Sequence, residues 1–248
     1  WFAGSAGNIV KWNGYALSPQ VSPSREGLSS LWGTDSRNVW AVGSSGTILK
    51  WDGTSWTAQV SGTTELLRGV WAADSKNVWA VGNNGVILRY DGTSWTTQAS
   101  GTTSQLTAVF GLNANNVFVV GGGGTLLKWD GAAWTLLSSD GISWWSGVWA
   151  SSPSNVWISG AAGAIRRWNG TTLTPVTSGV TVQLNSIWGS DASNVYAVGD
   201  KGTLLRYNGT SWGPLVSGSS QPLQGVFGIG SGNVFLVGNT GSILQRAP

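Results

Sequence analysis

The sequence contains no cysteine, no methionine and no histidine among its 248 residues, and Glu26 and Glu65 are its only glutamates. The lack of cysteine excludes a disulfide framework and zinc–thiolate sites. The lack of both cysteine and histidine also excludes nucleophile–histidine arrangements and histidine metal sites. We therefore expect no catalytic residues, no metal and no cofactor, and we predict that the protein is not an enzyme.

Charge is scarce as well. Only 9% of the residues are charged and the net charge is +3, so the basic isoelectric point reflects few acids rather than many bases. Nucleic acid is therefore not an expected partner. No stretch approaches the roughly 20 apolar residues of a membrane-spanning helix, so no membrane insertion is expected. A surface rich in serine, threonine, asparagine and glutamine favours an extracellular or cell-envelope location.

A tandem repeat with a step of 39 residues runs through the chain. The string NVWAVGSSGTILKWDGTSWT at residues 38–57 returns in altered form, and its first asparagine recurs without insertion or deletion. The recurring positions are Asn38, Asn77, Asn116, Asn155, Asn194 and Asn233. Such regularity marks copies of one supersecondary unit. Because the repeat is unbroken, we predict a single domain over residues 1–248.

Each repeat divides into four short segments rich in β-branched and aromatic residues, separated by glycine, asparagine and aspartate. In the reference copy, segment a covers residues 28–32, b covers 39–42, c covers 47–51, and d begins at Trp56. This pattern is typical of antiparallel strands joined by tight turns. Four strands at a step near 40 residues predict an all-β fold, a β-propeller of four-stranded antiparallel blades.

The turns carry separate signals. Between b and c stand Gly43 and Gly46, a pair present in every copy, which indicates positive φ or a close backbone approach. Between c and d, Asp52-Gly53 predicts a hairpin. Between a and b, Asp35 is expected to cap the turn and Asn38 to take a left-handed conformation.

The number of blades depends on the incomplete terminal repeats. The b–c hairpin occurs seven times, but the first copy lacks a and the last lacks d. Seven blades are favoured, because both terminal hairpins keep their glycines and apolar residues. In the alternative of six blades, the N-terminal d segment completes the last sheet and one hairpin is left over.

Aromatic residues recur at four fixed phases, represented by Trp32, Trp40, Trp51 and Trp56, and a repeated phase is what a repeated core requires. A basic residue also closes segment c in most copies. These residues are Lys11, Lys50, Arg89, Lys128, Arg167 and Arg206. We interpret them as solvated heads whose stems cover neighbouring tryptophan rings, with an anion-binding ring as the alternative.

In an up-and-down sheet the b–c turns and d–a loops share one face, and this is the face on which the copies differ. Function on repeat scaffolds usually lies in such variation. The candidate ligand-binding residues on it are Arg25, Glu26, Glu65, Asp140, Trp144, Arg166, Asp200 and Lys201. Trp145 has the phase of Leu67 and is expected in the core. Trp144 has no such counterpart, and an exposed tryptophan near Arg166 and Asp140 suits stacking on a sugar ring.

The phrases VWAVGxxGxILxWDGxxW and LxxVWGxD resemble bacterial β-propeller repeats of the BNR-like, two-component-regulator and photosystem-assembly-factor types. The resemblance covers the whole chain and implies a propeller, but such propellers include binding platforms, sensor domains and sialidases. Asp52 and Gly53 are adjacent, whereas the Asp-box consensus has a residue between them. The sialidase arginine cluster with its Tyr/Glu pair also has no matching positions.

These observations favour a non-catalytic, secreted or cell-surface binding propeller. The leading hypothesis is a lectin-like protein that binds glycans through pockets between blades or in the variable loops. The alternative is a structural, assembly or protein-interaction propeller, part of an extracellular array or of a larger sensor or adhesin. The expected partners are accordingly glycans or an extracellular protein or polymer.

Overall fold

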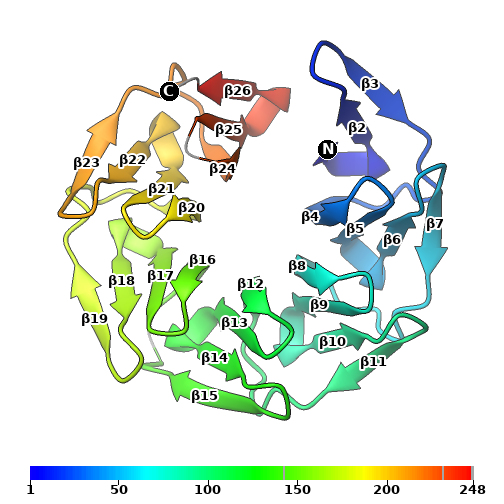
Figure 1. The fold of residues 1–248 in the computed structure, drawn as a ribbon, viewed down its shortest axis with the longest axis horizontal. Coiled ribbons are helices and arrows are strands. Elements are labelled where there is room, and N and C mark those ends of the chain that lie inside the picture. Colours follow the sequence, from blue (N-terminus) through cyan, green and yellow to red (C-terminus); the bar gives the residue numbers. More distant parts are fainter. Residues whose placement is uncertain (142, 231, 247–248) are drawn as a thin grey trace. The chain divides into compact units, whose positions relative to one another are not determined.

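The computed structural model describes residues 1–141, 143–230 and 232–246 and has the predicted all-β fold. The strands form seven small antiparallel sheets, the blades of a β-propeller, and each sheet follows chain order (Figure 1). Five blades have four strands and the two terminal blades have three. The prediction of seven blades is confirmed, because β3 pairs with β2 in its own sheet and does not complete the last one.

The strands in the first half of the chain fall into four blades. Blade 1 holds β1 (Phe2–Ala3), β2 (Ile9–Trp12) and β3 (Leu17–Gln20). Blade 2 holds β4 (Leu28–Asp35), β5 (Asn38–Gly43), β6 (Ile48–Trp51) and β7 (Trp56–Gln59). Blade 3 holds β8 (Leu67–Asp74), β9 (Asn77–Gly82), β10 (Ile87–Tyr90) and β11 (Trp95–Gln98). Blade 4 holds β12 (Leu106–Asn113), β13 (Asn116–Gly121), β14 (Leu126–Trp129) and β15 (Trp134–Ser138).

Three further blades follow. Blade 5 holds β16 (Trp145–Ser152), β17 (Asn155–Gly160), β18 (Ile165–Trp168) and β19 (Leu173–Val176). Blade 6 holds β20 (Leu184–Asp191), β21 (Asn194–Gly199), β22 (Leu204–Tyr207) and β23 (Trp212–Leu215). Blade 7 holds β24 (Leu223–Ile229), β25 (Asn233–Gly238) and β26 (Ile243–Arg246).

The helices are single 3-10 turns between the second and third strands of the repeat. They are η1 (Ser5–Gly7), η2 (Ser44–Gly46), η3 (Asn83–Gly85), η4 (Gly122–Gly124), η5 (Ala161–Gly163), η6 (Asp200–Gly202) and η7 (Asn239–Gly241). Within the described part of the chain, none of the helices has the length and apolar character needed to cross a membrane.

The chain divides into two compact units. Unit 1 contains residues 1–119 and 127–137, and unit 2 contains residues 120–126 and 138–248. The single domain expected over residues 1–248 stays a prediction.

Packing between neighbouring blades builds the core of unit 1. Trp40 and Val42 of blade 2 pack with Leu67, Val70 and Leu88 of blade 3, and all five are buried. The second strand of a repeat is apolar along most of its length because both of its faces are covered, unlike a strand with one solvated face. The phases of Trp40, Trp51 and Trp56 are thus mainly core positions, as predicted, whereas the phase of Trp32 is only partly buried at Trp32 and is exposed at Phe227.

The paired glycines of the b–c turn are required for two different reasons. Gly46 has φ of 67°, in the left-handed region, whereas Gly43 is extended. A Cβ on Gly43 would overlap the carbonyl oxygen of Gly27, and one on Gly46 would overlap that of Thr63. Both expectations are thus met, with positive φ at the second glycine and close backbone approach at both.

Aspartate organises the other two turns. Asp52 accepts hydrogen bonds from the backbone N–H groups of Thr54 and Ser55 at 2.8 and 2.9 Å, which closes the predicted hairpin. Asp35 accepts from the backbone of Arg37 at 2.8 Å, as expected of a capping residue. The prediction for Asn38 is wrong: it has no positive φ, begins strand β5, and its amide donates to the Asp35 carboxylate. That bond makes a left-handed conformation unnecessary.

These hydrogen bonds make the stability that the c–d turns contribute depend on pH. Hydrogen bonds from the Thr54 side chain and the backbone lower the pKa of Asp52 to about 2. Backbone hydrogen bonds also lower the pKa values of Asp91 and Asp130, at the same repeat position. Because an unfolded aspartate has a pKa near 3.9, these turns stabilise the folded state above about pH 4. The contribution is lost as the pH falls through the folded pKa values.

We predict that the triple variant D52N/D91N/D130N loses less thermal stability on acidification than the parent. Asparagine suits this turn, because Asn169 already accepts the same two backbone bonds, at 3.0 and 2.8 Å, from the N–H groups of Thr171 and Thr172. The Tm at neutral pH should stay close to that of the parent. Calorimetry in steps between about pH 6 and pH 2.5 checks this. An unchanged acid-induced fall in Tm would contradict it.

Candidate functional site

The b–c turns and d–a loops lie together, as the alternation of turns predicts. In unit 1, the backbone N–H of Gly46 donates to the carbonyl oxygen of Glu65 at 2.9 Å, and that of Ser44 donates to Gly27 at 2.9 Å. In unit 2, the N–H of Asp200 donates to Gln183 at 3.0 Å. Each turn is thus fastened by backbone hydrogen bonds to the neighbouring loop.

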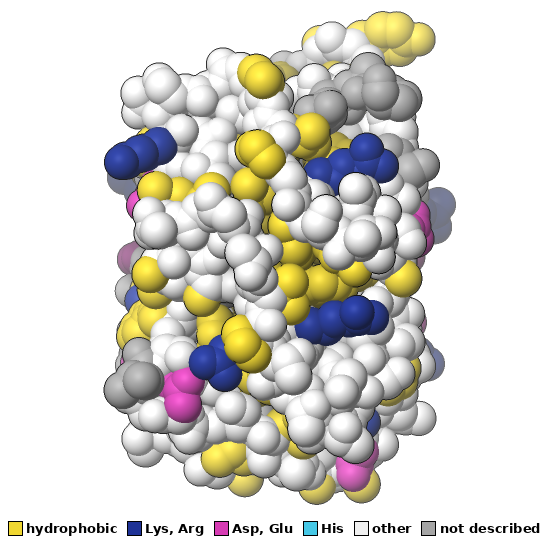
Figure 2. Space-filling model, turned by 90° about the vertical axis from the view of Figure 1, so that its left-hand side faces the viewer, with side chains coloured by type: hydrophobic (Ala, Val, Ile, Leu, Met, Phe, Trp, Pro, Cys, Tyr) yellow, Lys and Arg dark blue, Asp and Glu magenta, His cyan; other side chains and the backbone are white. Residues whose placement is uncertain are grey.

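On the opposite face, the basic residues that close segment c lie over aromatic rings. Lys50 Nζ is 5.6 Å from the ring centroid of Trp40 and 5.1 Å from that of Tyr90 in the next blade. Arg89 lies 5.5 Å from both Trp79 and Trp129. Figure 2 shows Lys and Arg side chains next to hydrophobic surface on another side of the molecule. The interpretation as ring-covering side chains is confirmed for all of these bases except Lys128, and Lys11, Lys50 and Arg89 each reach rings of two blades.

Replacing Arg89 with alanine should lower the free energy of unfolding by about 1–2 kcal/mol, because two cation–π contacts and the packing of the stem are lost. Its guanidinium also donates to the side-chain oxygen of Asn77 at 3.1 Å. Lys128 holds the same repeat position, but no contact between its ammonium and a ring is found within the described residues. Urea unfolding of Arg89→Ala and Lys128→Ala compares them. Equal losses would contradict a role for the cation–π contacts.

Blade 5 departs most from the repeat on the variable face. Arg166 occupies the position at which Leu49, Leu88, Leu127 and Leu205 are fully or almost fully buried. Its guanidinium lies 5.4 Å from the ring centroid of Trp145 and 3.8 Å from the carboxylate of Asp140. A cation has therefore replaced a core leucine without becoming isolated, since a ring and an opposite charge face it.

Trp144 projects from the same loop. Its side chain is 43% exposed, whereas Trp145 beside it is 1% exposed, so both burial predictions are confirmed. The Trp144 ring lies against Gly122 in turn η4, where a Cβ would come within 2.9 Å of the ring. The other copies carry serine, asparagine, alanine or aspartate at this turn position. Glycine at 122 therefore makes room for the exposed indole.

The loop that carries Asp140 is held by its own hydrogen bonds. The Asp140 carboxylate accepts from the backbone N–H and the hydroxyl of Ser143, at 2.8 and 2.5 Å. The hydroxyl of Ser139 and the N–H of Gly141 both donate to the carbonyl oxygen of Gly123, at 3.1 and 2.9 Å. The loop is thus fixed on the triple-glycine turn, and the Asp140 carboxylate is positioned before any ligand arrives.

We name the group of Asp140, Trp144, Trp145 and Arg166, with Gly122 beneath it, the blade-5 cluster. It offers an apolar ring surface, a guanidinium with several N–H donors and a carboxylate. The side chains of Arg166 and Asp140 are 33% and 30% exposed, so a ligand can reach them. Such a combination recognises a ligand with one apolar face and a few polar groups.

The remaining predicted site residues lie elsewhere. Asp200 and Lys201 form turn η6, in which the Asp200 carboxylate accepts from Asn185 at 3.2 Å and Lys201 has φ of 56°. They belong to blade 6, whereas the residues of the blade-5 cluster come from blade 5, its preceding loop and turn η4. In unit 1, Arg25 and Glu26 are exposed in the loop before β4, with the N–H of Glu26 bonded to Ser24.

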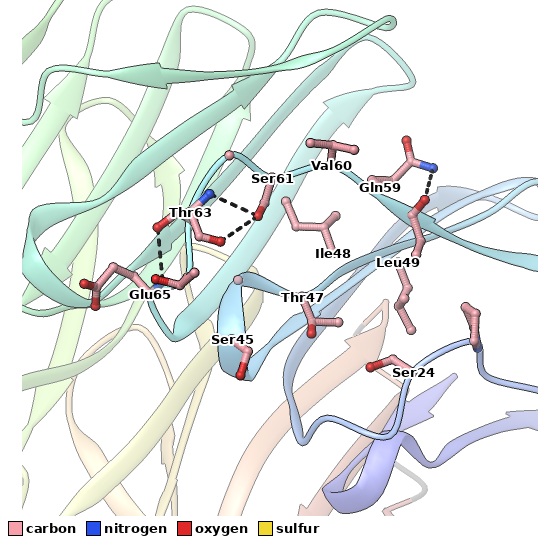
Figure 3. A pocket seen from close by; sticks show the side chains of 15 residues that line it. Ser24, Ser45, Thr47, Ile48, Leu49, Gln59, Val60, Ser61, Thr63 and Glu65 are labelled. Atoms are coloured by element: carbon pink, nitrogen blue, oxygen red, sulfur yellow. Dashed lines mark hydrogen bonds between the residues drawn. The ribbon is translucent and has the colours of Figure 1, made fainter.

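Glu65 lines an open groove of about 750 Å³ in unit 1 (Figure 3). Its lining mixes serine and threonine residues, such as Ser24, Ser45 and Thr63, with apolar residues such as Ile48 and Val60. The Glu65 carboxylate accepts from the side-chain amide of Asn84 at 2.8 Å, so it is already engaged by the next turn. The groove therefore offers hydroxyl groups but no free cluster of charges.

Two features of the variable face were missed in the sequence. Gly122 differs visibly from the other copies, but only its place under the Trp144 ring shows why it departs from the repeat. Arg68, on β8, donates from Nε to the side-chain oxygen of Asn83 at 2.9 Å, and burial lowers the pKa of its guanidinium. The sequence did contain a signal for Arg68. The copies carry different residues at its repeat position, and serine is the only residue that occurs there twice.

Metal-dependent chemistry finds no support in the described residues. No three aspartate or glutamate side chains among them are close enough together to hold a metal ion. The strongest local feature therefore remains the blade-5 cluster.

Comparison with known proteins supports the fold. No family model matches the chain, and no curated protein matches it. The structure is similar to a solved structure described as YCF48 bound to D1 peptide, with a TM-score of 0.70 and 16% identity, over 91% of this chain and 79% of that one. It is also similar to YCF48 from Cyanidioschyzon merolae, with a TM-score of 0.51 and 15% identity, over 92% of this chain and 98% of that one. At such identities the likeness shows the β-propeller fold alone, and the repeat family that the sequence resembles is not confirmed by it.

Proposed function

We propose that this protein is a non-catalytic protein-interaction propeller that binds an extended polypeptide segment at the blade-5 cluster. The proposal rests on one observation: five residues that depart from the repeat lie in one place. A core leucine, a second leucine, two loop residues and a turn residue are replaced by Arg166, Trp145, Trp144, Asp140 and Gly122. Packing alone does not require these changes, because blades 2, 3 and 6 form without them.

The kind of ligand is argued from the cluster and from the similar structure. Tryptophan and arginine are the residues that most often dominate the binding energy of protein interfaces. The structurally similar YCF48 is described with a bound peptide, which supports a polypeptide ligand here. The alternative of a protein-interaction or assembly propeller is thus better supported than the leading glycan hypothesis. An extracellular location stays a prediction from composition.

A repeat-restoring variant tests the proposal. Substituting Asp140→Gly, Trp144→Gln, Trp145→Leu and Arg166→Leu installs residues that other blades already carry at these positions. A displayed random-peptide library is selected on the parent protein, and the enriched peptides are then measured on both proteins by fluorescence anisotropy. We expect peptides with Kd in the micromolar range for the parent and a loss of about 30-fold or more in the variant. Equal affinities would overturn the proposal.

A saccharide ligand is the second candidate, and it rests on the exposed indole of Trp144 and on the Asp140–Arg166 pair. Sugar rings stack on such an indole, while a carboxylate and a guanidinium take the hydroxyl groups. A glycan array and titration with free sugars, each with the parent and Trp144→Ala, test it. Binding that Trp144→Ala abolishes would support a lectin. No binding at millimolar concentrations would end this candidate.

A further inference from the structure

Arg68 is a cation at a place where the other blades carry neutral side chains. It is the second residue of β8 and is half-buried. The equivalent positions hold Ser29, Thr107, Ser146, Asn185 and Gln224, so a blade forms without a charge there. Partial burial of a charge is unfavourable unless an opposite charge or good hydrogen bonds compensate it. The arginine therefore needs an explanation other than folding.

Two neutral amides hold the guanidinium of Arg68 in place. Its Nε donates to the side-chain oxygen of Asn83, in turn η3, at 2.9 Å. Gln105, in the loop before β12, is oriented so that its amide oxygen accepts from Nε at 2.7 Å and from Nη2 at 3.1 Å. The oxygen end of each amide faces the cation, so each N–H2 end is turned away from it. The guanidinium is thus oriented, but its charge is not neutralised.

Most of the hydrogen-bond donors of Arg68 are not used by these amides. A guanidinium has five N–H groups, and the bonds to Asn83 and Gln105 use the one on Nε and one on Nη2. The other N–H groups, on Nη1 and Nη2, have no acceptor among the described residues. No described carboxylate lies within salt-bridge distance of Arg68. Glu65, the acidic residue nearest to it in the sequence, is bonded to Asn84 at 2.8 Å.

Blade 6 shows that this corner of the repeat accommodates a carboxylate. Asp200 holds the position of Asn83 there, and its carboxylate accepts from the side-chain amide of Asn185, the equivalent of Arg68, at 3.2 Å. Blade 3 has a stronger donor but no acid at the turn position. The fork of Nη1 and Nη2 matches the two oxygens of a planar carboxylate, and one guanidinium balances one negative charge. A dianion would keep a charge uncompensated in a half-buried site.

We propose that Arg68, Asn83 and Gln105 form a second binding site, which binds a carboxylate end-on across Nη1 and Nη2 of Arg68. All three residues belong to unit 1 and none belongs to the blade-5 cluster. The inference therefore does not depend on the function proposed for that cluster. The recognised group is the carboxylate itself, whether a polypeptide side chain, a chain end or a small organic acid carries it.

Titration with sodium acetate tests the site, and the readout is the Arg68 Nε–H signal in proton–nitrogen correlation spectra. Sodium chloride keeps the ionic strength constant. A charge-assisted pair of hydrogen bonds should give a saturable shift with a Kd of about 10–100 mM. The Nε–H signal of Arg37, an exposed residue in the a–b turn of blade 2, is the control in the same spectra and should not saturate. Acetylglycine and acetyl-glutamate amide then compare a chain-end carboxylate with a side-chain carboxylate.

Two variants separate binding from a structural role. Gln105→Glu keeps Arg68 but supplies a carboxylate of its own, so the acetate affinity should fall about tenfold or more while the Tm is not lowered. Arg68→Gln installs the residue that blade 7 carries at this position, and acetate should then no longer shift the backbone amide signal of Asn83. An Arg68 shift that does not saturate, an unchanged acetate affinity in Gln105→Glu, or tighter binding of sulfate than of acetate would each overturn the proposal.

Discussion

Replacing Gly46 with alanine is expected to destabilise the protein by about 3 kcal/mol or more. The residue has φ of 67°, and a Cβ there would overlap the backbone oxygen of Thr63 rather than a movable side chain. A left-handed alanine alone costs about 1–2 kcal/mol, and displacing the loop adds to this cost. Urea unfolding followed by tryptophan fluorescence measures the change. The loss should appear as a lower midpoint at an unchanged m-value.

The neighbouring position provides the matched control. Ser45 also has a positive φ, of 53°, yet Ala6 and Ala162 occupy the equivalent position in other turns. Ser45→Ala should therefore change the unfolding free energy by less than about 0.5 kcal/mol. A similar loss for both variants would show that the clash at Gly46 is not the cause.

Replacing Trp144 with alanine is expected to weaken peptide binding by about 30-fold or more while leaving stability almost unchanged. An interface tryptophan commonly contributes about 2 kcal/mol or more, whereas a side chain that is 43% exposed contributes little to the core. The peptides are those selected on the parent protein. Anisotropy gives the affinity, and calorimetry confirms the fold.

Trp145→Leu is the contrasting substitution. Trp145 is 1% exposed and lies under the Arg166 guanidinium, so it positions Arg166 rather than presenting a surface. Leucine occupies this position in other blades. We expect a smaller loss of affinity than for Trp144→Ala. If Trp144→Ala binds as tightly as the parent, Trp144 is not the anchor.

Most of the architecture could be predicted because the hairpin at the centre of the repeat occurs seven times in the sequence. A single turn glycine is weak evidence, but Gly43 and Gly46 recur at the same spacing in each copy, and repetition separates structural constraint from chance. The core position of Trp145 followed from the phase of Leu67 in the same way. Asn38 was assigned the wrong conformation because its bond to Asp35 depends on side-chain geometry that the spacing does not reveal.

The candidate site could be predicted only in part. Departure from the repeat identified Asp140, Trp144 and Arg166, and the structure brings Asp140 to 3.8 Å from Arg166. The same criterion also selected Asp200 and Lys201, whose positions are explained by the local geometry of their turn. Repeat alignment shows where copies differ, but it does not show which differences meet in space.

The most direct test is a crystal structure of the protein with a peptide selected on it. We predict that the peptide contacts the Trp144 indole and that one of its polar groups bonds to Arg166 or Asp140. The five departures of the blade-5 cluster would then form one binding surface. A peptide seated only in the groove beside Glu65, with the blade-5 cluster untouched, would contradict the proposed site.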